Sequence, residues 1–117
     1  MPNNSKGVSP DEPIITNEKG GKQAQTAYAF DLIDPDAILA LAEVLKHGAD
    51  KYGKDNWRNI TVAENFNHML IHYYAWLKGD TSDDHLAHMF TRAMMLYATA
   101  KAESDMRERK VATKNVE

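Results

Sequence analysis

The chain has 117 residues, a formal net charge of −3, 43% hydrophobic and 26% charged residues, and no cysteine. These values fit one soluble globular domain without disulfides or thiolate metal sites, and they argue against a partner of long nucleic acid, which needs a basic face. The sequence holds no run of about 18 apolar residues, so we expect no membrane partner. Because the opening MPNNSKGVSPDEP lacks an apolar segment, we expect no secretory signal and a cytoplasmic location.

Residues 1–30 are expected to form an extended arm, although their polar composition also fits a disordered tail. They contain several prolines and no periodic apolar pattern beyond Ile14 and Ile15. The segment NEKGGKQ places two glycines before Lys22 and Gln23. Such a loop can bring backbone N–H groups and an ammonium to an anion, but its spacing is not that of a P-loop.

The first helix is expected to begin after Asp34, because aspartate is a good N-cap and Pro35 suits the first helical position. Gly53 is expected to close it. Apolar residues at helical spacing predict a buried stripe: Ile38, Leu41, Ala42, Leu45, Ala49 and Tyr52. Polar residues beside it predict a second stripe: Glu43, His47 and Asp50. In the following loop, Trp57 and Arg58 require a partner, either the core or a flat ligand.

The second helix is expected to begin at Thr61, because Thr61 and Glu64 form a capping-box pattern, and to end at Gly79. Its predicted core residues are Phe66, Met69, Leu70, Tyr73 and Leu77. Its polar flank holds Glu64, His68 and His72.

The third helix is expected to begin near Thr81 or Ser82, with Asp83 and Asp84 in its first turn. Its predicted core residues are Leu86, Met89, Phe90, Ala93, Tyr97 and Ala100. Its polar flank holds His85, His88 and Arg92. After Ala102 the chain is strongly charged and either continues as a solvated helix or frays.

These elements predict a mainly α fold, a small antiparallel bundle of about three helices with an extended N-terminal arm. We expect an arm over residues 1–30, a helical nucleotide-binding domain over 31–105 and a charged tail over 106–117. Three amphipathic helices in so short a chain often leave an apolar face that a second copy covers, so we expect a homo-oligomer.

The polar flanks of the three helices predict one cleft if they converge. Carboxylates and imidazoles bind divalent metals, which neutralise phosphate oxygens or activate a water. Each histidine alone is better explained as a boundary residue between core and solvent, whereas the set of four between Glu64 and Ala98 favours a functional site. Asp83 and Asp84 are explained by the helix dipole, whereas Asp80, which follows Gly79, fits a metal or ribose contact better.

Three groups of residues carry a resemblance to a known family: Gly20–Gln23, Lys51–Gly53 with Asn56–Arg58, and His85–His88 preceded by His72, Gly79 and Asp80. Over residues 17–100 the chain resembles a phage-associated family of dATP/dGTP diphosphohydrolase N-terminal domains. The resemblance implies a purine nucleotide ligand and a bacteriophage origin, and thus the cytoplasm of an infected bacterial host.

Under this hypothesis the protein is a metal-dependent diphosphohydrolase that cleaves dATP or dGTP to the monophosphate and pyrophosphate. The predicted catalytic residues are Glu43, Asp50 and His88, and the predicted ligands of Mg²⁺ or Mn²⁺ are Asp80, Asp83 and His85. The predicted substrate-binding residues are Lys22, Gln23, Lys51, Tyr52, Asn56, Trp57, Arg58, His72 and Arg92.

The alternative hypothesis is a non-catalytic sponge. All-α nucleotide pyrophosphohydrolases place Glu-x-x-Glu and Glu-x-x-Asp on two helices, and no predicted helix here carries Glu-x-x-Glu. The same cleft would then sequester a host nucleotide immune signal, such as a cyclic oligonucleotide or an ADP-ribose derivative, to counter antiphage defence. A third interpretation is a structural helical module whose polar flanks only mark its solvent boundary.

Overall fold

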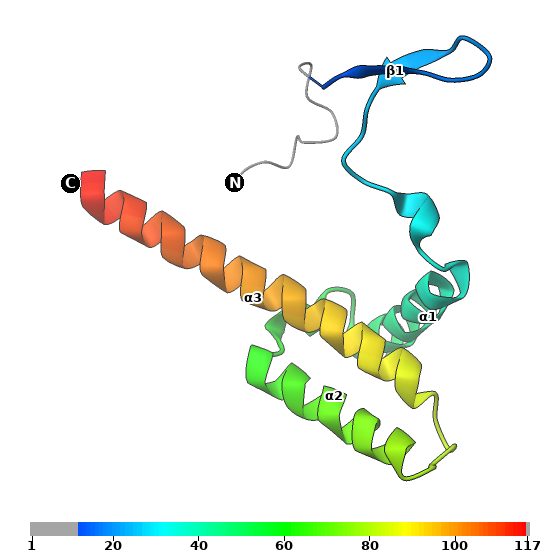
Figure 1. Cartoon of the computed structure of the whole chain (residues 1–117). Helices are drawn as coiled ribbons and strands as arrows, with labels where there is room; N and C mark the ends of the chain where they lie inside the picture. Colours follow the sequence, from blue (N-terminus) through cyan, green and yellow to red (C-terminus); the bar gives the residue numbers. More distant parts are fainter. Residues whose placement is uncertain (1–11, 117) are drawn as a thin grey trace. The chain divides into compact units, whose positions relative to one another are not determined.

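The computed structural model describes residues 12–116 and is mainly helical, with three α-helices and a two-stranded antiparallel sheet (Figure 1). The predicted mainly α fold with three helices is confirmed, and the predicted extended arm contains two short strands. The chain divides into two compact units between Asp34 and Pro35, and each unit is described by itself. None of the described helices is long and apolar enough to cross a membrane.

The N-terminal unit is built around a short hairpin of β1 (Ile14–Thr16) and β2 (Lys22–Ala24), followed by the 3-10 helix η2 (Phe30–Leu32). In the hairpin turn, the Asn17 carboxamide oxygen accepts hydrogen bonds from the backbone N–H groups of Lys19 and Gly21, at 3.0 and 2.8 Å. Gly20 has a φ of 84°, a conformation that favours glycine. The geometry of the turn therefore explains the glycine at position 20, and the N–H groups of Lys19 and Gly21 are already hydrogen-bonded to Asn17.

The C-terminal unit begins with α1 (Pro35–Tyr52). Gly53 closes this helix as predicted: its φ is 99° and its N–H donates to the Ala49 carbonyl at 2.8 Å. The 3-10 helix η3 (Asn56–Asn59) follows after Asp55, which has a φ of 64°.

The helix α2 (Val62–Leu77) begins with the predicted capping box. The Thr61 hydroxyl accepts from the Glu64 N–H at 3.1 Å, and the Glu64 carboxylate accepts from the Thr61 N–H at 3.0 Å. Gly79, with a φ of 90°, ends the helical segment as predicted. These local patterns set the limits of α2 without reference to the rest of the fold.

The helix α3 (His85–Val116) begins later than predicted. It continues through the charged segment after Ala102, which was one of the two outcomes expected there. The Asp84 carboxylate accepts from the Ala87 N–H at 3.1 Å, so Asp84 acts as the cap and the preceding residues stay outside the helix. The charged segment after Ala102 is helical, with a salt bridge of 2.9 Å between Lys101 and Asp105 one turn apart.

The helices α2 and α3 lie side by side as an antiparallel hairpin, and α1 and η3 contact α3 (Figure 1). The predicted core residues do not fill this packing: Phe66, Leu70, Tyr73 and Leu77 of α2 and Leu86, Phe90 and Tyr97 of α3 are exposed. The helices instead meet through other faces, where Asn65, Thr91 and Ala87 are buried. The expected inward face was wrong because small and polar side chains allow α3 to pack closely.

Candidate functional site

A cavity of about 990 Å³ opens between the second half of α1, η3 and the α2–α3 hairpin. Many predicted site residues line it. From α1 and η3 these are Lys51, Tyr52, Asn56 and Trp57, and from the hairpin they are His72, Asp83, His88 and Arg92. His47, Glu64 and His68, from the predicted polar flanks, also line it. The flanks of the three helices therefore converge on one cleft.

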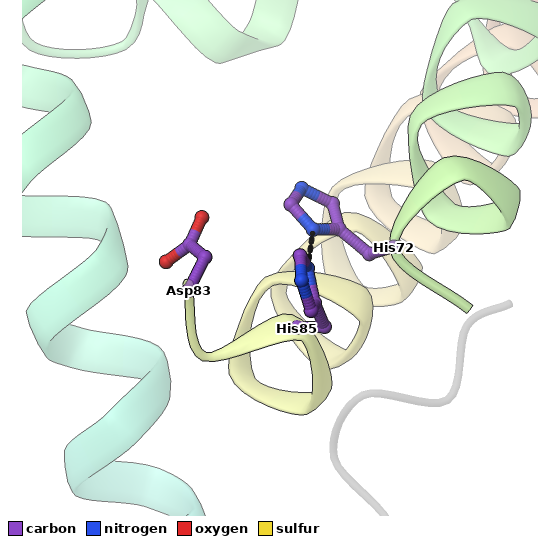
Figure 2. A group of neighbouring side chains, drawn as sticks. All are labelled: His72, Asp83 and His85. Carbon is purple, nitrogen blue, oxygen red and sulfur yellow. Dashed lines mark hydrogen bonds between the residues drawn. The ribbon is translucent and has the colours of Figure 1, made fainter. Parts of the chain in front are cut away.

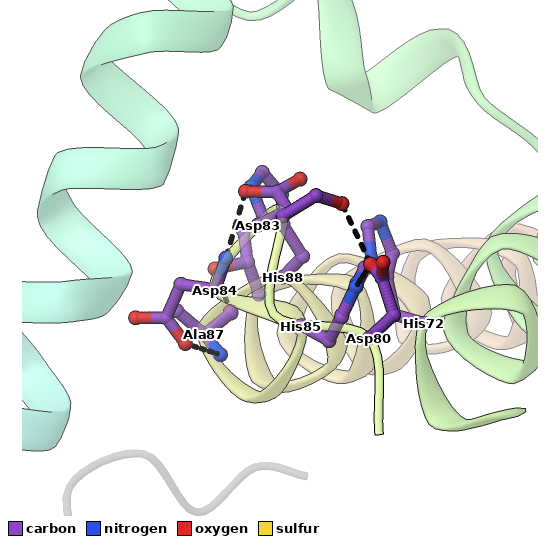
Figure 3. A network of polar contacts seen from close by, with 9 residues as sticks. His72, Asp80, Asp83, Asp84, His85, Ala87 and His88 are labelled. Carbon is purple, nitrogen blue, oxygen red and sulfur yellow. Dashed lines mark hydrogen bonds and ion pairs between the residues drawn. The ribbon is translucent and has the colours of Figure 1, made fainter. Parts of the chain in front are cut away.

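Three histidines from two helices meet beside this cleft (Figure 3). His72 Nδ1 lies 2.9 Å from His85 Nδ1, a hydrogen bond that joins α2 to α3. The rings of His72 and His88 are stacked, with centroids 4.8 Å apart and planes 11° apart. His88 Nε2 in turn lies 3.3 Å from Asp83 Oδ1. The cluster is thus a contiguous network from His85 through His72 and His88 to Asp83.

Asp80 fixes the orientation of His85. One carboxylate oxygen of Asp80 accepts from the Ser82 hydroxyl and from His85 Nε2, each at 2.6 Å (Figure 3). The hydrogen bonds from Ser82 and, next, from His85 hold the pKa of Asp80 below its usual value, so its carboxylate is ionised at neutral pH. His85 Nε2–H therefore donates to Asp80, and Nδ1 is the His85 atom that faces His72.

Burial is the main cause that lowers the pKa of His72, and the neighbouring His88 and His85 lower it further. His72 is consequently a neutral imidazole at neutral pH. Its Nδ1–H donates to His85 Nδ1 in the metal-free protein. Neutral imidazole nitrogens are the form that binds metals.

His72, Asp83 and His85 together fit a divalent metal. Each offers one ligand atom, and these atoms all lie within 4.8 Å of one another (Figure 2). Two imidazoles and one carboxylate suit Mn²⁺, Co²⁺, Ni²⁺ or Zn²⁺ better than Mg²⁺, which prefers oxygen ligands. Of the predicted ligands, the group contains Asp83 and His85; Asp80 instead holds His85 from behind, as orienting carboxylates do in metal sites.

Arg92 is anchored at the cleft wall by a residue that the sequence did not single out. Arg92 Nη1 donates to the Asn65 side-chain oxygen at 3.1 Å, and Asn65 is fully buried. Burial lowers the pKa of Arg92, but arginine remains a cation in proteins. Asn65 shares the helical face of His68 and His72, three and seven residues later, and this spacing is the signal that could have identified it.

Trp57 lines the cleft, and the guanidinium of Arg58 lies over its ring at 4.4 Å. Arg58 does not line the cleft, and its Nε donates to Asp55 at 3.2 Å. One face of the indole is therefore covered by a cation from its own loop. Both roles predicted for these residues in substrate binding stay predictions.

Of four further predicted site residues, two lie outside the cleft on α1 and two belong to the N-terminal unit. Glu43 and Asp50 are exposed on α1 and do not line the cleft, and both carboxylate oxygens of Asp50 accept from Lys46, at 2.6 and 2.7 Å. Lys22 and Gln23 are exposed on β2 in the N-terminal unit. The catalytic and substrate-binding roles of these four residues stay predictions.

A comparison with known protein families matches the part of the chain that contains the cleft residues. Residues 17–109 match the family described as dATP/dGTP diphosphohydrolase, N-terminal. The chain belongs to this family. The match confirms the resemblance and extends beyond the cleft residues into the charged part of α3. No curated protein and no solved structure matches the chain.

Proposed function

We propose that the protein is a metal-dependent diphosphohydrolase that converts dATP or dGTP to the monophosphate and pyrophosphate. The observation that carries this proposal is the His72, Asp83 and His85 group beside a cleft lined by cations and aromatic rings. The family description names the same reaction class.

The cleft has the size and lining that a nucleoside triphosphate needs. Its volume of about 990 Å³ lies at the upper end of the range for small-molecule sites. Lys51, Lys54 and Arg92 line the cleft, and these cations would contact the phosphate oxygens. Trp57 offers an indole on which a purine can stack.

In the proposed reaction, the oxygen of a water molecule bonds to the α-phosphorus and the bond from that phosphorus to the α,β-bridging oxygen breaks. Pyrophosphate leaves with the electron pair of the broken bond. His88, which lines the cleft and lies beside Asp83, would accept the proton of the water. His72, Asp83 and His85 would hold the metal, which when bound supplies positive charge to the phosphates and acidifies a bound water.

The test is incubation of the purified full chain with dATP or dGTP in the presence of Mn²⁺, Co²⁺ or Mg²⁺, with products identified by mass spectrometry. We expect monophosphate and pyrophosphate in equal amounts, with Mn²⁺ or Co²⁺ more effective than Mg²⁺. H88N should lower the rate about 10² to 10⁴-fold, the range for loss of a general base. Absence of pyrophosphate with every metal would contradict the proposal.

A second candidate function is sequestration without turnover, and the scarcity of free carboxylates in the cleft supports it. Among the described lining residues the carboxylates are Asp55, Glu64 and Asp83. Asp55 pairs with Arg58, and Glu64 belongs to the capping box. Only Asp83 of these three contacts the histidine cluster.

Under this second candidate, the cleft would hold a host nucleotide signal, such as a cyclic oligonucleotide or an ADP-ribose derivative, and a phage would use it against host defence. The same mass spectrometry distinguishes the two functions. A ligand recovered intact after the loaded protein is denatured supports sequestration, whereas a cleaved ligand supports the hydrolase.

A further inference from the structure

The C-terminal unit, residues 35–117, buries few apolar side chains within itself. In the part of the chain that the structure describes, the buried apolar residues are Ala87 and Met95, while Asn65 and Thr91 are the fully buried side chains. Apolar burial is the main favourable contribution to folding and must offset the conformational entropy of the chain. A unit with so small an apolar core therefore requires a further apolar contact.

Exposed large apolar side chains occur over much of α2, including Ile71, Tyr74 and Trp76, and two stripes among those of α2 and α3 supply such a contact. They lie at helical spacing and are between 37% and 71% exposed: Phe66, Leu70, Tyr73 and Leu77 on α2, and Leu86, Phe90 and Tyr97 on α3. We call these seven residues the outer face.

Both stripes lie on the same side of the α2–α3 hairpin. The two helices are joined by the hydrogen bonds from Arg92 to Asn65 and between His72 and His85. Phe66, Tyr73 and Leu86 each follow one of these joining residues by one position, a rotation of about 100°. In an antiparallel pair, the same rotation from mutually facing positions turns both helices to the same side.

The cleft lies on the opposite side of the hairpin. Glu64 precedes the joining residue Asn65, Thr91 precedes the joining residue Arg92, and both line the cleft. The rotation from each joining residue to the residue before it is also about 100°, but in the opposite sense to the rotation that leads to the outer face. A partner on the outer face therefore leaves the cleft accessible.

The outer face is uncharged, which determines the partner that suits it. Residues 65–77 contain no Asp, Glu, Lys or Arg, and residues 85–100 contain only Arg92, which faces Asn65. A two-fold interface places identical surfaces together, so a charge near the two-fold axis would meet the same charge of the second copy. An uncharged apolar surface avoids this repulsion and pairs with its own copy.

The area of the outer face also suits a stable dimer. Large side chains have about 150–250 Å² to bury, and seven of them that are about half exposed offer roughly 600–800 Å². Stable protein interfaces bury about 800 Å² on each partner. We propose that the outer face joins two copies of the chain into a dimer whose centre is a four-helix arrangement of two α2–α3 hairpins. This inference does not depend on nucleotide binding.

The test is the mass of the full chain in solution, measured by light scattering during gel filtration. We expect twice the 13.2 kDa of one chain at micromolar concentration. The double variant L70E/F90E places charges on the outer face and should have the mass of a single chain. The matched control L39E, at a residue of α1 that is 67% exposed, should remain dimeric.

A folded wild-type protein with the mass of one chain would overturn the proposal, and so would a dimer that L70E/F90E does not dissociate. Should L70E/F90E fail to fold, thermal unfolding of the wild type decides. A Tm that rises between about 1 and 100 μM protein supports a dimer, because mass action stabilises the associated state. A Tm independent of concentration overturns it.

Discussion

Replacing Asp80 by asparagine tests whether the histidine cluster is a metal site in which the Asp80 carboxylate orients the ligand His85 by a hydrogen bond. The substitution keeps the shape of the side chain and removes its charge. One Asp80 oxygen holds both Ser82 Oγ and His85 Nε2 at 2.6 Å, and His85 offers its other ring nitrogen to the metal group. Loss of such an orienting carboxylate costs about 10 to 100-fold in metal affinity.

The expected magnitude for D80N lies at the lower end of that range. The Asp80 side chain is 37% exposed, so solvent screens part of its interaction with His85. We therefore expect about tenfold weaker binding of Co²⁺ or Mn²⁺, which corresponds to about 1.4 kcal/mol.

The measurement is isothermal titration calorimetry of the wild type and two variants with Co²⁺ and Mn²⁺. D84N is the matched control, because it removes the same charge four residues later in the link between α2 and α3, and asparagine still caps α3 at the Ala87 N–H. We expect D84N to bind within about twofold of the wild type, as for a screened charge near the protein surface.

Three results would refute this reasoning. Equal losses in D80N and D84N would show that only the local charge matters. Unchanged binding in D80N would show that Asp80 does not orient His85 toward the metal. Absence of metal binding by the wild type would show that His72, Asp83 and His85 do not form a metal site.

Three further predictions concern the helix cap, the cleft and the pH. T61A removes the acceptor of the Glu64 N–H and should lower the free energy of unfolding in urea by about 1 kcal/mol; the exposed T113A, measured at the same protein concentration, should change it by less than about 0.5 kcal/mol, and equal effects would exclude the cap. K51Q should weaken dATP binding about fivefold, as expected for one partly screened phosphate contact, whereas K78Q, outside the cleft, should not; equal effects would exclude a specific contact by Lys51. The pKa of His72 is lowered in the fold, so its neutral form stabilises the metal-free protein above the ordinary value of 6.5, and this contribution is lost as the pH falls below 6.5 toward the lower folded pKa. Unfolding in chelator at several pH values between 5 and 8 should therefore give a shallower pH dependence for H72N than for the wild type, and identical slopes would contradict the shifted pKa.

The sequence by itself determined the features that depend on neighbouring residues. The capping box of Thr61 and Glu64 and the helix ends at Gly53 and Gly79 are local hydrogen-bond and backbone rules, and the structure has them where the sequence placed them. The start of α3 was misplaced because Thr81, Ser82, Asp83 and Asp84 are all residue types that cap helices, and the structure uses Asp84.

The cleft was predictable in outline, because each of the three helices carries a polar flank and these flanks form a cleft where they converge. His47, His68, His72, His88 and Arg92 are brought together as that pattern indicated. Which residues of the site form the metal group and which orient them was not predictable. It depends on contacts across the hairpin, such as His72 with His85, whose partners are thirteen residues apart.

Only the tertiary structure decided which face of each helix turns inward. Phe66 and Leu70 form the more apolar stripe of α2, yet Asn65 is the residue buried against α3. Helical periodicity predicts that an apolar face will be buried. The same periodicity is found for a face buried in the core of one chain and for a face buried in an interface between chains. The side that packs is selected by how closely α1, α2 and α3 fit, and that fit exists only once all three helices are in place.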